Sequence, residues 1–201
     1  PRSQVWISTA ENFLARRVRY TILQVSRDRI MAYSDFTVGK VKQAFGIETI
    51  EGNRFFPDLP AVQPSQTLID FLAETLPLAV ALPSEKAKSE LLISPILVEV
   101  RKYLDRRVSL FSGQDFTVDA EVGLSGVCDF LMSRSPEQLE IEAPVVILVE
   151  AKKADINSGM GQCMAEMVAA QRFNQAAQTP LKTIYGCVSS GILWRFLKLE
   201  Q

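Results

Sequence analysis

The segment Val145-Val-Ile-Leu-Val-Glu150-Ala-Lys152 decides the fold, because a run of aliphatic residues ends abruptly in an acid and a base. A short, continuous apolar run of this kind is typical of a strand buried on both faces of a sheet. Residues two apart in a strand point to the same side of the sheet. Glu150 and Lys152 are therefore expected to share one face at the end of an otherwise apolar strand.

The preceding strand supplies a second carboxylate. Gly126-Val-Cys-Asp-Phe-Leu-Met132 predicts a core strand from Val127 to Met132, and Asp129 lies within it. Residues 133–144, rich in serine, proline and glutamate, form the connecting loop. Strands that follow each other in the chain usually lie side by side, so Asp129 is expected close to Glu150 and Lys152.

Upstream of these strands the hydrophobic period changes. Val108 to Leu124 alternate with a period of two, interrupted at Gly113-Gln-Asp115, and predict one or two strands. Before them, Ser84 begins a helical pattern whose apolar stripe holds Leu92, Ile96, Val100 and Tyr103. Pro95 interrupts this pattern, so we expect either a kink or a new helix with Ser94 as its N-cap.

Downstream of Lys152 the pattern returns to a helix and then to strands. Asn157-Ser-Gly159 opens a helix that is predicted to run to about Asn174, and Thr183 to Val188 and Ile192 to Leu199 form a closing hairpin. The predicted order is helix, three antiparallel strands, helix and two strands. This order predicts an α/β fold with a mixed central sheet flanked by helices.

The charge is unevenly spread along the 201 residues. Residues 1–30 hold six arginines and two acids, a net charge of 6 − 2 = +4, whereas the other 171 residues hold 16 basic and 21 acidic side chains, or −5. We therefore predict three parts: residues 1–30 as an N-terminal extension outside the functional unit, residues 31–83 as an N-terminal helical and loop region, and residues 84–201 as the core.

Region 31–83 predicts two short helices separated by a loop over residues 46–66, which is punctuated by glycine and proline. The first helix would be capped by Ser34 or Asp35. The second, from about Leu68 to Thr75, would be capped by Ser65 or Thr67.

The chain contains no histidine, which limits the kinds of catalytic and metal site that it can form. Ser-His and Cys-His catalysis are excluded, as is a histidine general base. The three cysteines are widely spaced, form no CxxC pair and read as small core residues, which excludes a zinc site and fits a reducing compartment. A bound metal ion would have to be held by oxygen atoms, which favours Mg²⁺, Mn²⁺ or Ca²⁺.

The composition is that of an ordinary globular protein, with 47% hydrophobic and 22% charged residues. No apolar run approaches the roughly 20 residues that cross a bilayer, and no signal-peptide pattern stands at the start, so we expect a cytoplasmic protein without membrane contact. The net charge of −1 creates no overall basic field, which argues mildly against tight autonomous binding of DNA.

The order of these elements and their charged residues resembles the PD-(D/E)XK nuclease superfamily, also called restriction-endonuclease-like. The resemblance covers about residues 84–199, and the closing stretch Tyr185-Gly-Cys-Val-Ser-Ser-Gly-Ile-Leu-Trp194 is similar to the N-terminal nuclease domain of type I restriction enzyme motor subunits. The proline that gives the superfamily its name is absent here, since Cys128 precedes Asp129. The resemblance implies a restriction-endonuclease-like α-β-β-β-α-β core and a Mg²⁺-dependent nuclease acting on nucleic acid, with DNA as the expected substrate.

The resemblance also implies a set of metal ligands. Asp129 and Glu150 would hold Mg²⁺ or Mn²⁺, with the carbonyl oxygen of Ala151 as a third ligand. Glu90 would be the acid of the first core helix that completes the metal shell, and Glu85 is its rival on the same helix.

Lys152 would orient or help to deprotonate the attacking water, and Gln162 corresponds to a glutamine of the following helix. The physical logic holds apart from the family, because a divalent cation neutralises the phosphodiester and lowers the pKa of a bound water. A homodimer is compatible with the resemblance, although no interface stripe stands out in the sequence.

Other interpretations of the same residues stay open. Glu150 and Lys152 would also fit a solvated ion pair at a strand end, and Lys153 fits surface. The basic cluster Arg101, Lys102, Arg106 and Arg107 fits both DNA phosphates and the helix dipole. At the level of the whole chain, the alternatives are a catalytically inactive domain of the same fold that binds nucleic acid or protein, and an unrelated protein with a surface charge network.

Overall fold

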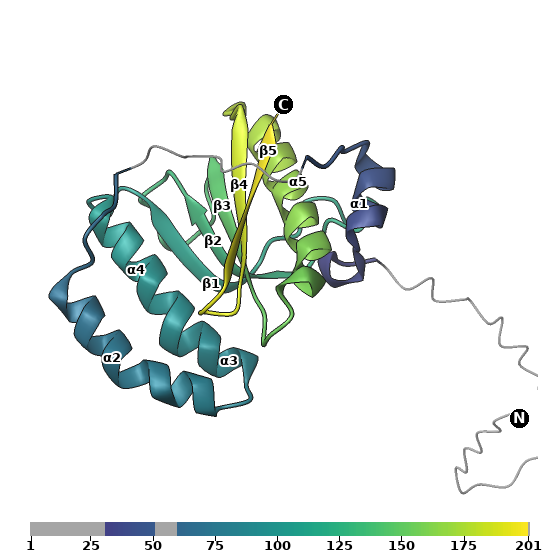
Figure 1. Cartoon of the computed structure of the whole chain (residues 1–201). Helices are drawn as coiled ribbons and strands as arrows, with labels where there is room; N and C mark the ends of the chain where they lie inside the picture. Colours follow the sequence, from purple (N-terminus) through teal and green to yellow (C-terminus); the bar gives the residue numbers. More distant parts are fainter. Residues whose placement is uncertain (1–30, 51–59, 201) are drawn as a thin grey trace, which may run out of the picture.

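The computed structural model describes residues 31–50 and 60–200, and its centre is one five-stranded mixed sheet of an α/β fold (Figure 1). The strands are β1 (Ser109–Asp115), β2 (Val127–Ser133), β3 (Val145–Ala151), β4 (Thr183–Ser189) and β5 (Trp194–Glu200). They lie in chain order across the sheet, and only β3 and β4 are parallel. The predicted order of elements and the mixed sheet are confirmed.

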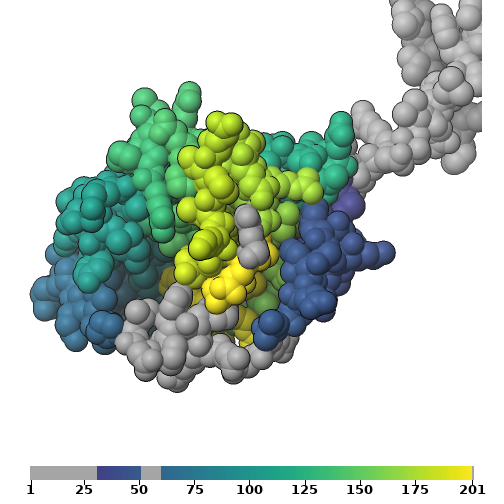
Figure 2. Space-filling view, turned by 90° about the horizontal axis from the view of Figure 1, so that it is seen from above, coloured from purple at the N-terminus to yellow at the C-terminus, as the bar shows by residue number. Residues whose placement is uncertain are grey.

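Helices cover both faces of this sheet. They are α1 (Val38–Phe45), α2 (Gln66–Ala81), α3 (Glu85–Lys88), α4 (Ser94–Tyr103) and α5 (Met160–Ala176), with short 3-10 turns at Tyr33–Asp35, Ala120–Val122 and Ile156–Gly159. Helices α5 and α1 lie on one side, and α2, α3 and α4 on the other (Figure 1). Seen from above, the α1 and α2–α4 layers stand apart with the strands β4 and β5 between them (Figure 2).

Alternation along the central strands builds a core on each side of the sheet. Leu131 and Leu148 pack towards α5, whereas their neighbours Phe130 and Val149 pack towards Ile93 of the α3–α4 layer. Strand β3 therefore buries both faces, as its continuous apolar sequence predicts.

The residues just before α1 belong to the same core as α5. Tyr33 and Phe36 are buried, and the hydroxyl of Tyr33 donates a hydrogen bond to the carbonyl of Phe116 at 2.5 Å. The packing thus crosses the predicted boundary between regions 31–83 and 84–201. The predicted extension over residues 1–30 lies outside the described residues, as does segment 51–59 of the predicted loop.

Two helix starts differ in part from the expectation. Helix α1 is capped by Thr37, whose side chain accepts a hydrogen bond from the Lys40 N–H, while Ser34 and Asp35 lie in the preceding 3-10 turn. Helix α2 is capped by Ser65, one of the two predicted residues, but it continues to Ala81 through Pro77.

Pro95 stands in the first turn of α4, as one of the two alternatives predicts, but Ser94 is not the N-cap, because the residues before it are already helical. Between α3 and α4 the helix widens into a π-helical turn at Ser89–Ile93, and Ser94 has helical backbone angles and no capping role. Proline has no N–H for the carbonyl of Leu91 one turn earlier. The Thr75 hydroxyl of α2 lies 3.0 Å from that oxygen and 2.9 Å from the carbonyl oxygen of Phe71, so its single proton is shared between these two acceptors.

The predicted break near Gly113 is a local irregularity within one continuous strand, and the register of β1 against β2 is the same on both sides of it. Gly113 has a φ of 63°, and the pairing of β1 with β2 steps over it from Ser112 opposite Phe130 to Gln114 opposite Cys128. A left-handed backbone is open to glycine at little cost, which explains the residue here. The second half of the predicted strand region holds only a single bridge, between Asp119 and Leu124.

We expect Gly161→Ala to destabilise the protein. A Cβ at Gly161 would lie 2.4 Å from the carbonyl oxygen of Phe36 and 2.5 Å from the carbonyl carbon of Thr37, both backbone atoms. The close approach of α5 to the residues before α1 therefore requires glycine, and overpacking should cost about 2–3 kcal/mol, measured by urea unfolding.

The matched control is Gly39→Ala on the exposed side of α1, where the nearest atom to an added Cβ is 4.0 Å away. This substitution should raise stability by up to about 1 kcal/mol, because alanine favours the helix. Equal effects of the two substitutions would contradict the close packing of α5 against Phe36.

All three cysteines are buried and free, in line with the prediction of small core residues. None of the helices in residues 31–50 and 60–200 combines the length and the apolar character that a membrane crossing requires.

Candidate functional site

The site lies where strands β2 and β3 diverge. Their last paired residues are Phe130 and Val149. Beyond this pair, the backbone N–H of Ala151 donates a hydrogen bond to Oδ2 of Asp129 at 2.8 Å. The Asp129 carboxylate thus accepts the hydrogen bond that a backbone carbonyl of β2 would accept in a regular strand pair. This contact holds Asp129 next to Glu150, the residue before Ala151.

Glu150 and Lys152 form a direct ion pair on the face of the sheet that α5 covers. The Lys152 ammonium donates a hydrogen bond to Oε1 of Glu150. The side chain of Glu150 is only 2% exposed and that of Lys152 19% exposed. The backbone N–H of Lys152 bonds to the Ser189 carbonyl at 2.8 Å, which continues the pairing of β3 with β4. This burial rules out a solvated ion pair at a strand end.

Gln162 of α5 joins the site from above the sheet. Its Nε2 donates to Oε2 of Glu150 at 2.9 Å and to Oε1 of Glu166 at 3.1 Å. Both N–H groups of the carboxamide are therefore used, each on a carboxyl group. Glu166 is fully buried, and its second oxygen has no hydrogen-bond partner.

The structure does not bring Glu90 to this cluster. Its side chain is 60% exposed and pairs with Lys86 at 2.8 Å. Glu85 instead accepts a hydrogen bond from the backbone N–H of Lys153 at 3.0 Å, directly after the site. Five residues are about 1.4 turns of helix, so Glu85 and Glu90 point in clearly different directions. The acidic residue of this helical stretch that reaches the end of β3 is therefore Glu85 and not Glu90.

Gly159 lets the chain before α5 lie against the site. A Cβ at this position would stand 2.8 Å from Cγ1 of Val188, 2.9 Å from Cε of Lys152 and 3.1 Å from Cγ of Glu150. The absence of a side chain at Gly159 allows the Ile156–Gly159 turn to hold the ion pair against β4.

The electrostatics favour protons on the buried acids. Burial, with the neighbouring charge of Asp129, raises the pKa of Glu150 to about 7 despite the opposing effect of Lys152. Burial also raises the pKa of Asp129, partly offset by the hydrogen bond from Ala151. Burial, reinforced by the charge of Glu150, raises the pKa of Glu166 well above its usual range.

Lys152 stays charged in this environment. Burial lowers the pKa of its ammonium, but the hydrogen bond and charge of Glu150, together with Glu85 and Asp129, outweigh burial and raise the pKa. The carboxyl groups of Glu150, Glu85 and Asp129 thus all act on the one ammonium of Lys152. A further positive charge, such as a bound cation, would favour the ionised forms of the buried Glu150 and Asp129.

The residues fit a hard divalent cation of the magnesium type. Within the described ranges, no group of three or more histidine, cysteine, aspartate or glutamate side chains is arranged to hold a metal ion. Mg²⁺, however, usually keeps several waters and binds proteins through one or two carboxylates. Asp129 and Glu150 are the two side chains that would hold such an ion here.

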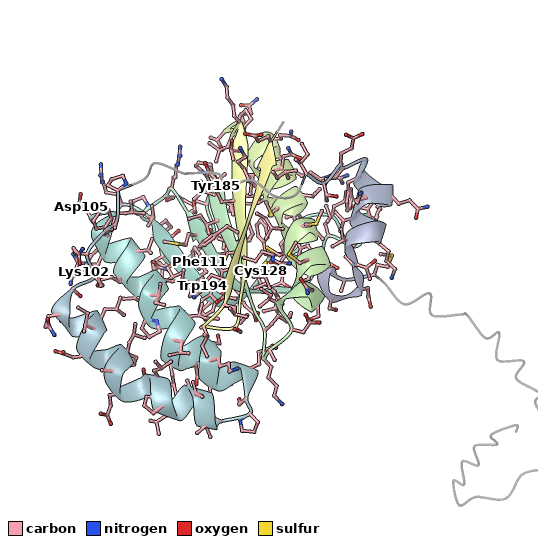
Figure 3. The ribbon with its side chains drawn as sticks, viewed as in Figure 1. Lys102, Asp105, Phe111, Cys128, Tyr185 and Trp194 are labelled. Atoms are coloured by element: carbon pink, nitrogen blue, oxygen red, sulfur yellow. The ribbon has the colours of Figure 1, made fainter. Side chains whose placement is uncertain are left out.

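The basic cluster at the end of α4 lies away from this site. Lys102 and Asp105 are found at the outer end of α4, apart from Cys128, which adjoins Asp129 (Figure 3). Arg101 lies 16 residues after Glu85 along the helix, about 24 Å at 1.5 Å per residue. Its guanidinium donates to the carbonyl of Val108 at 3.0 Å, a contact that ties the helix end to the start of β1.

Glu166 is the site residue that the sequence analysis missed. Four residues after Gln162, it shares one face of the helix with that residue, opposite the methionines and Cys163, as a solvent-facing polar residue would. However, α5 is covered by the sheet on one side and by the residues around Phe36 and α1 on the other. A signal was present, because Glu166 is the single charged residue between Asp155 and Arg172.

Comparisons with known proteins returned nothing: no family model, no curated protein and no solved structure matches this chain.

Proposed function

We propose that the protein is a Mg²⁺- or Mn²⁺-dependent nuclease of the PD-(D/E)XK type that hydrolyses phosphodiester bonds of DNA. The observation that carries the proposal is the convergence of Asp129, Glu150 and Lys152 at the diverging ends of two neighbouring strands. The element order supports it, because α5 crosses from β3 to a parallel β4 after three antiparallel strands.

Each residue has a role in this proposal. Asp129 and Glu150 hold the cation, which supplies charge neutralisation and a more acidic bound water. Lys152 stands beside Glu150, where its ammonium orients the attacking water and stabilises the charge that develops on the phosphoryl oxygens. Gln162 fixes the Glu150 carboxylate from above, so that the ligand keeps one rotamer.

Basic side chains line the approach to the site and fit a polyanionic substrate. Lys153 is exposed directly after Lys152, and Lys88 of α3 donates to its backbone carbonyl at 2.5 Å. On the other side, Arg195 of β5 bonds to Asn157 at 2.5 Å, in the turn that follows β3. Cations on both sides of a buried catalytic group suit a phosphate backbone, whose contacts come mainly from lysine and arginine.

A second candidate function is a catalytically inactive domain that binds nucleic acid or a protein through the same surface. One observation favours it: both oxygens of Glu150 already accept hydrogen bonds, one from Lys152 and one from Gln162. Metal binding at Glu150 would have to rearrange at least one of these contacts.

A cleavage assay with a matched pair of variants separates the two functions. Plasmid DNA and single-stranded DNA are incubated with the protein and Mg²⁺ or Mn²⁺, with EDTA as the negative control. Asp129→Asn should abolish cleavage, because it removes the charge but keeps an oxygen for the Ala151 N–H. Asp70→Asn on the exposed side of α2 should cleave like the parent. Cleavage that survives Asp129→Asn would overturn the nuclease assignment, and binding of DNA without any cleavage would support the inactive domain.

We expect Gly159→Ala to lower the cleavage rate about tenfold or more without unfolding the protein. The added methyl group would press on Lys152 and Glu150, and small misplacement of catalytic groups costs large factors in rate. The flexible lysine stem can yield, so the melting temperature should fall by only a few degrees. A parental cleavage rate in a folded Gly159→Ala protein would contradict the tight packing of the turn on the ion pair.

A further inference from the structure

Glu166 has a contact pattern that stability does not explain. Its side chain is fully buried in the middle of α5, and only one of its oxygens has a hydrogen-bond partner. A buried carboxyl group with an unpartnered oxygen costs free energy whatever its ionisation. An apolar residue of the same length would pack in this place without that cost.

Two polar groups near Glu166 donate hydrogen bonds to backbone carbonyls and not to its carboxyl group. The Tyr33 hydroxyl donates to the carbonyl of Phe116, and the Cys163 thiol donates to the carbonyl of Cys187 at 3.7 Å. Within the part of the chain that the structure describes, Gln162 is the sole hydrogen-bond donor to the Glu166 carboxyl group. Among the described residues, accepting this hydrogen bond from Gln162 is therefore the one polar interaction that the Glu166 carboxyl group makes.

The carboxamide of Gln162 is held between two carboxyl groups. One N–H points to Glu150 and the other to Glu166, so a rotation of the amide would break both hydrogen bonds at once. No hydrogen bond to the amide oxygen of Gln162 is found within the described ranges, so the two N–H contacts alone set the orientation of the amide.

We propose that Glu166 is a positioning residue of the site, which fixes the orientation of the Gln162 carboxamide and through it the Glu150 carboxylate. The role rests on the proposed nuclease function, in which Glu150 binds the cation and Gln162 holds the Glu150 carboxylate by a hydrogen bond. Glu166 itself touches neither substrate nor cation. In the order Glu166, Gln162, Glu150, Lys152, each side chain holds the next in place.

Two variants test this role. Glu166→Gln keeps an oxygen that accepts from Gln162, whereas Glu166→Met has a similar length and removes every acceptor. We expect Glu166→Gln to cleave DNA within a few-fold of the parent and Glu166→Met to lose about tenfold or more, the factor that one lost hydrogen bond can carry. The melting temperature of Glu166→Met should not fall below that of the parent, because the methionine removes a buried unpartnered oxygen.

The second readout needs neither metal nor activity. In ¹⁵N-labelled metal-free protein, the side-chain NH₂ resonances of Gln162 are assigned by their loss in Gln162→Leu. Glu166→Met should move them towards the position of a solvated amide and speed their exchange with water, and Glu166→Gln should leave them dispersed. A merely structural role for Glu166 would change stability without this local effect.

The outcomes are separable. Resonances of Gln162 that stay unchanged in Glu166→Met, or a parental cleavage rate in that variant, would overturn the positioning role. An equal loss in Glu166→Gln would also overturn it, because the acceptor is then not what matters. A parent protein that never cleaves DNA, but whose Gln162 resonances respond as expected, would refute the nuclease function and support the hold of Glu166 on Gln162.

Discussion

Lys152→Met is expected to reduce metal-dependent DNA cleavage by about 100-fold or more, while Lys153→Met leaves most of the activity intact. The magnitude is that of removing one preorganised group that stabilises developing charge in a water-poor site. Methionine keeps much of the length of the lysine stem, so the packing against Gly159 is preserved. The measurement is the single-turnover cleavage rate of a DNA substrate at saturating Mg²⁺.

The two neighbouring lysines make a sharp comparison because they differ mainly in position. The Lys152 side chain is 19% exposed and bonded to Glu150, whereas Lys153 is exposed and contacts Glu85 and Lys88 only through its backbone. Loss of Lys153 removes one charge from the approach of the substrate, which should weaken binding and its salt dependence slightly. Equal losses in the two variants would indicate that the lysines act by bulk charge and would contradict a catalytic role for Lys152.

The elements around the site could be predicted from the sequence because their signals are local. The apolar run before Glu150 and the alternation after Val127 specify two strands whose order along the chain makes them neighbours. Ser65 and Ser84 cap helices by hydrogen bonds to residues three positions on, so their signal is also local.

The errors arise where a distant segment decides the outcome. The π-helical turn before Pro95 contacts a hydroxyl from α2, which no pattern within the helix contains. The choice between Glu85 and Glu90 depends on how the helix is rotated against the end of β3, and that rotation is set by tertiary packing. The sequence leaves Glu85 as a rival of Glu90, and the structure shows that Glu85 is the one beside Lys153.

Glu166 shows a further limit of reasoning from one helix at a time. An amphipathic pattern assigns polar residues to solvent, but α5 is packed between the sheet and the segment around Phe36, so two of its polar residues, Glu166 and Asn174, are buried. Gly161 has no side chain and so permits the close approach of α5 to Phe36, and it is the one sign of this packing within the helix sequence. The burial of Glu166 beside Gln162 follows from the layer order of the fold, and the helix sequence alone does not specify it.

Glu150→Gln should separate stability from function. The variant is expected to lose cleavage by about 100-fold or more, because the ligand charge is gone. Its metal-free form should nevertheless gain stability relative to the parent as the pH rises. Burial, with the charge of Asp129, raises the pKa of Glu150 to about 7 in the folded protein, above its ordinary value of 4.5.

The sign of the effect follows from proton binding. Between pH 4.5 and about 7 the folded parent holds a proton at Glu150 that the unfolded chain has released, so stability falls as the pH rises through this window. A shift from 4.5 to about 7 corresponds to a loss on the order of 3 kcal/mol above pH 7. Glutamine cannot ionise, so the difference between variant and parent should grow from pH 5 to pH 8. Urea unfolding at these pH values measures it, and parallel pH profiles would contradict the titration of Glu150 in this range.

Added Mg²⁺ completes the test at pH 8. A cation that binds the folded parent at about 100 times its dissociation constant would stabilise it by about 2.7 kcal/mol, which offsets most of the cost of the ionised Glu150. The Glu150→Gln protein should show little of this gain, and neither protein should show much at pH 5, where Glu150 is protonated. Glu90→Gln, which changes an exposed acid on the neighbouring helix, should respond to Mg²⁺ like the parent. Equal stabilisation of all three proteins by Mg²⁺ would place the cation away from Glu150 and remove the physical basis of the nuclease assignment.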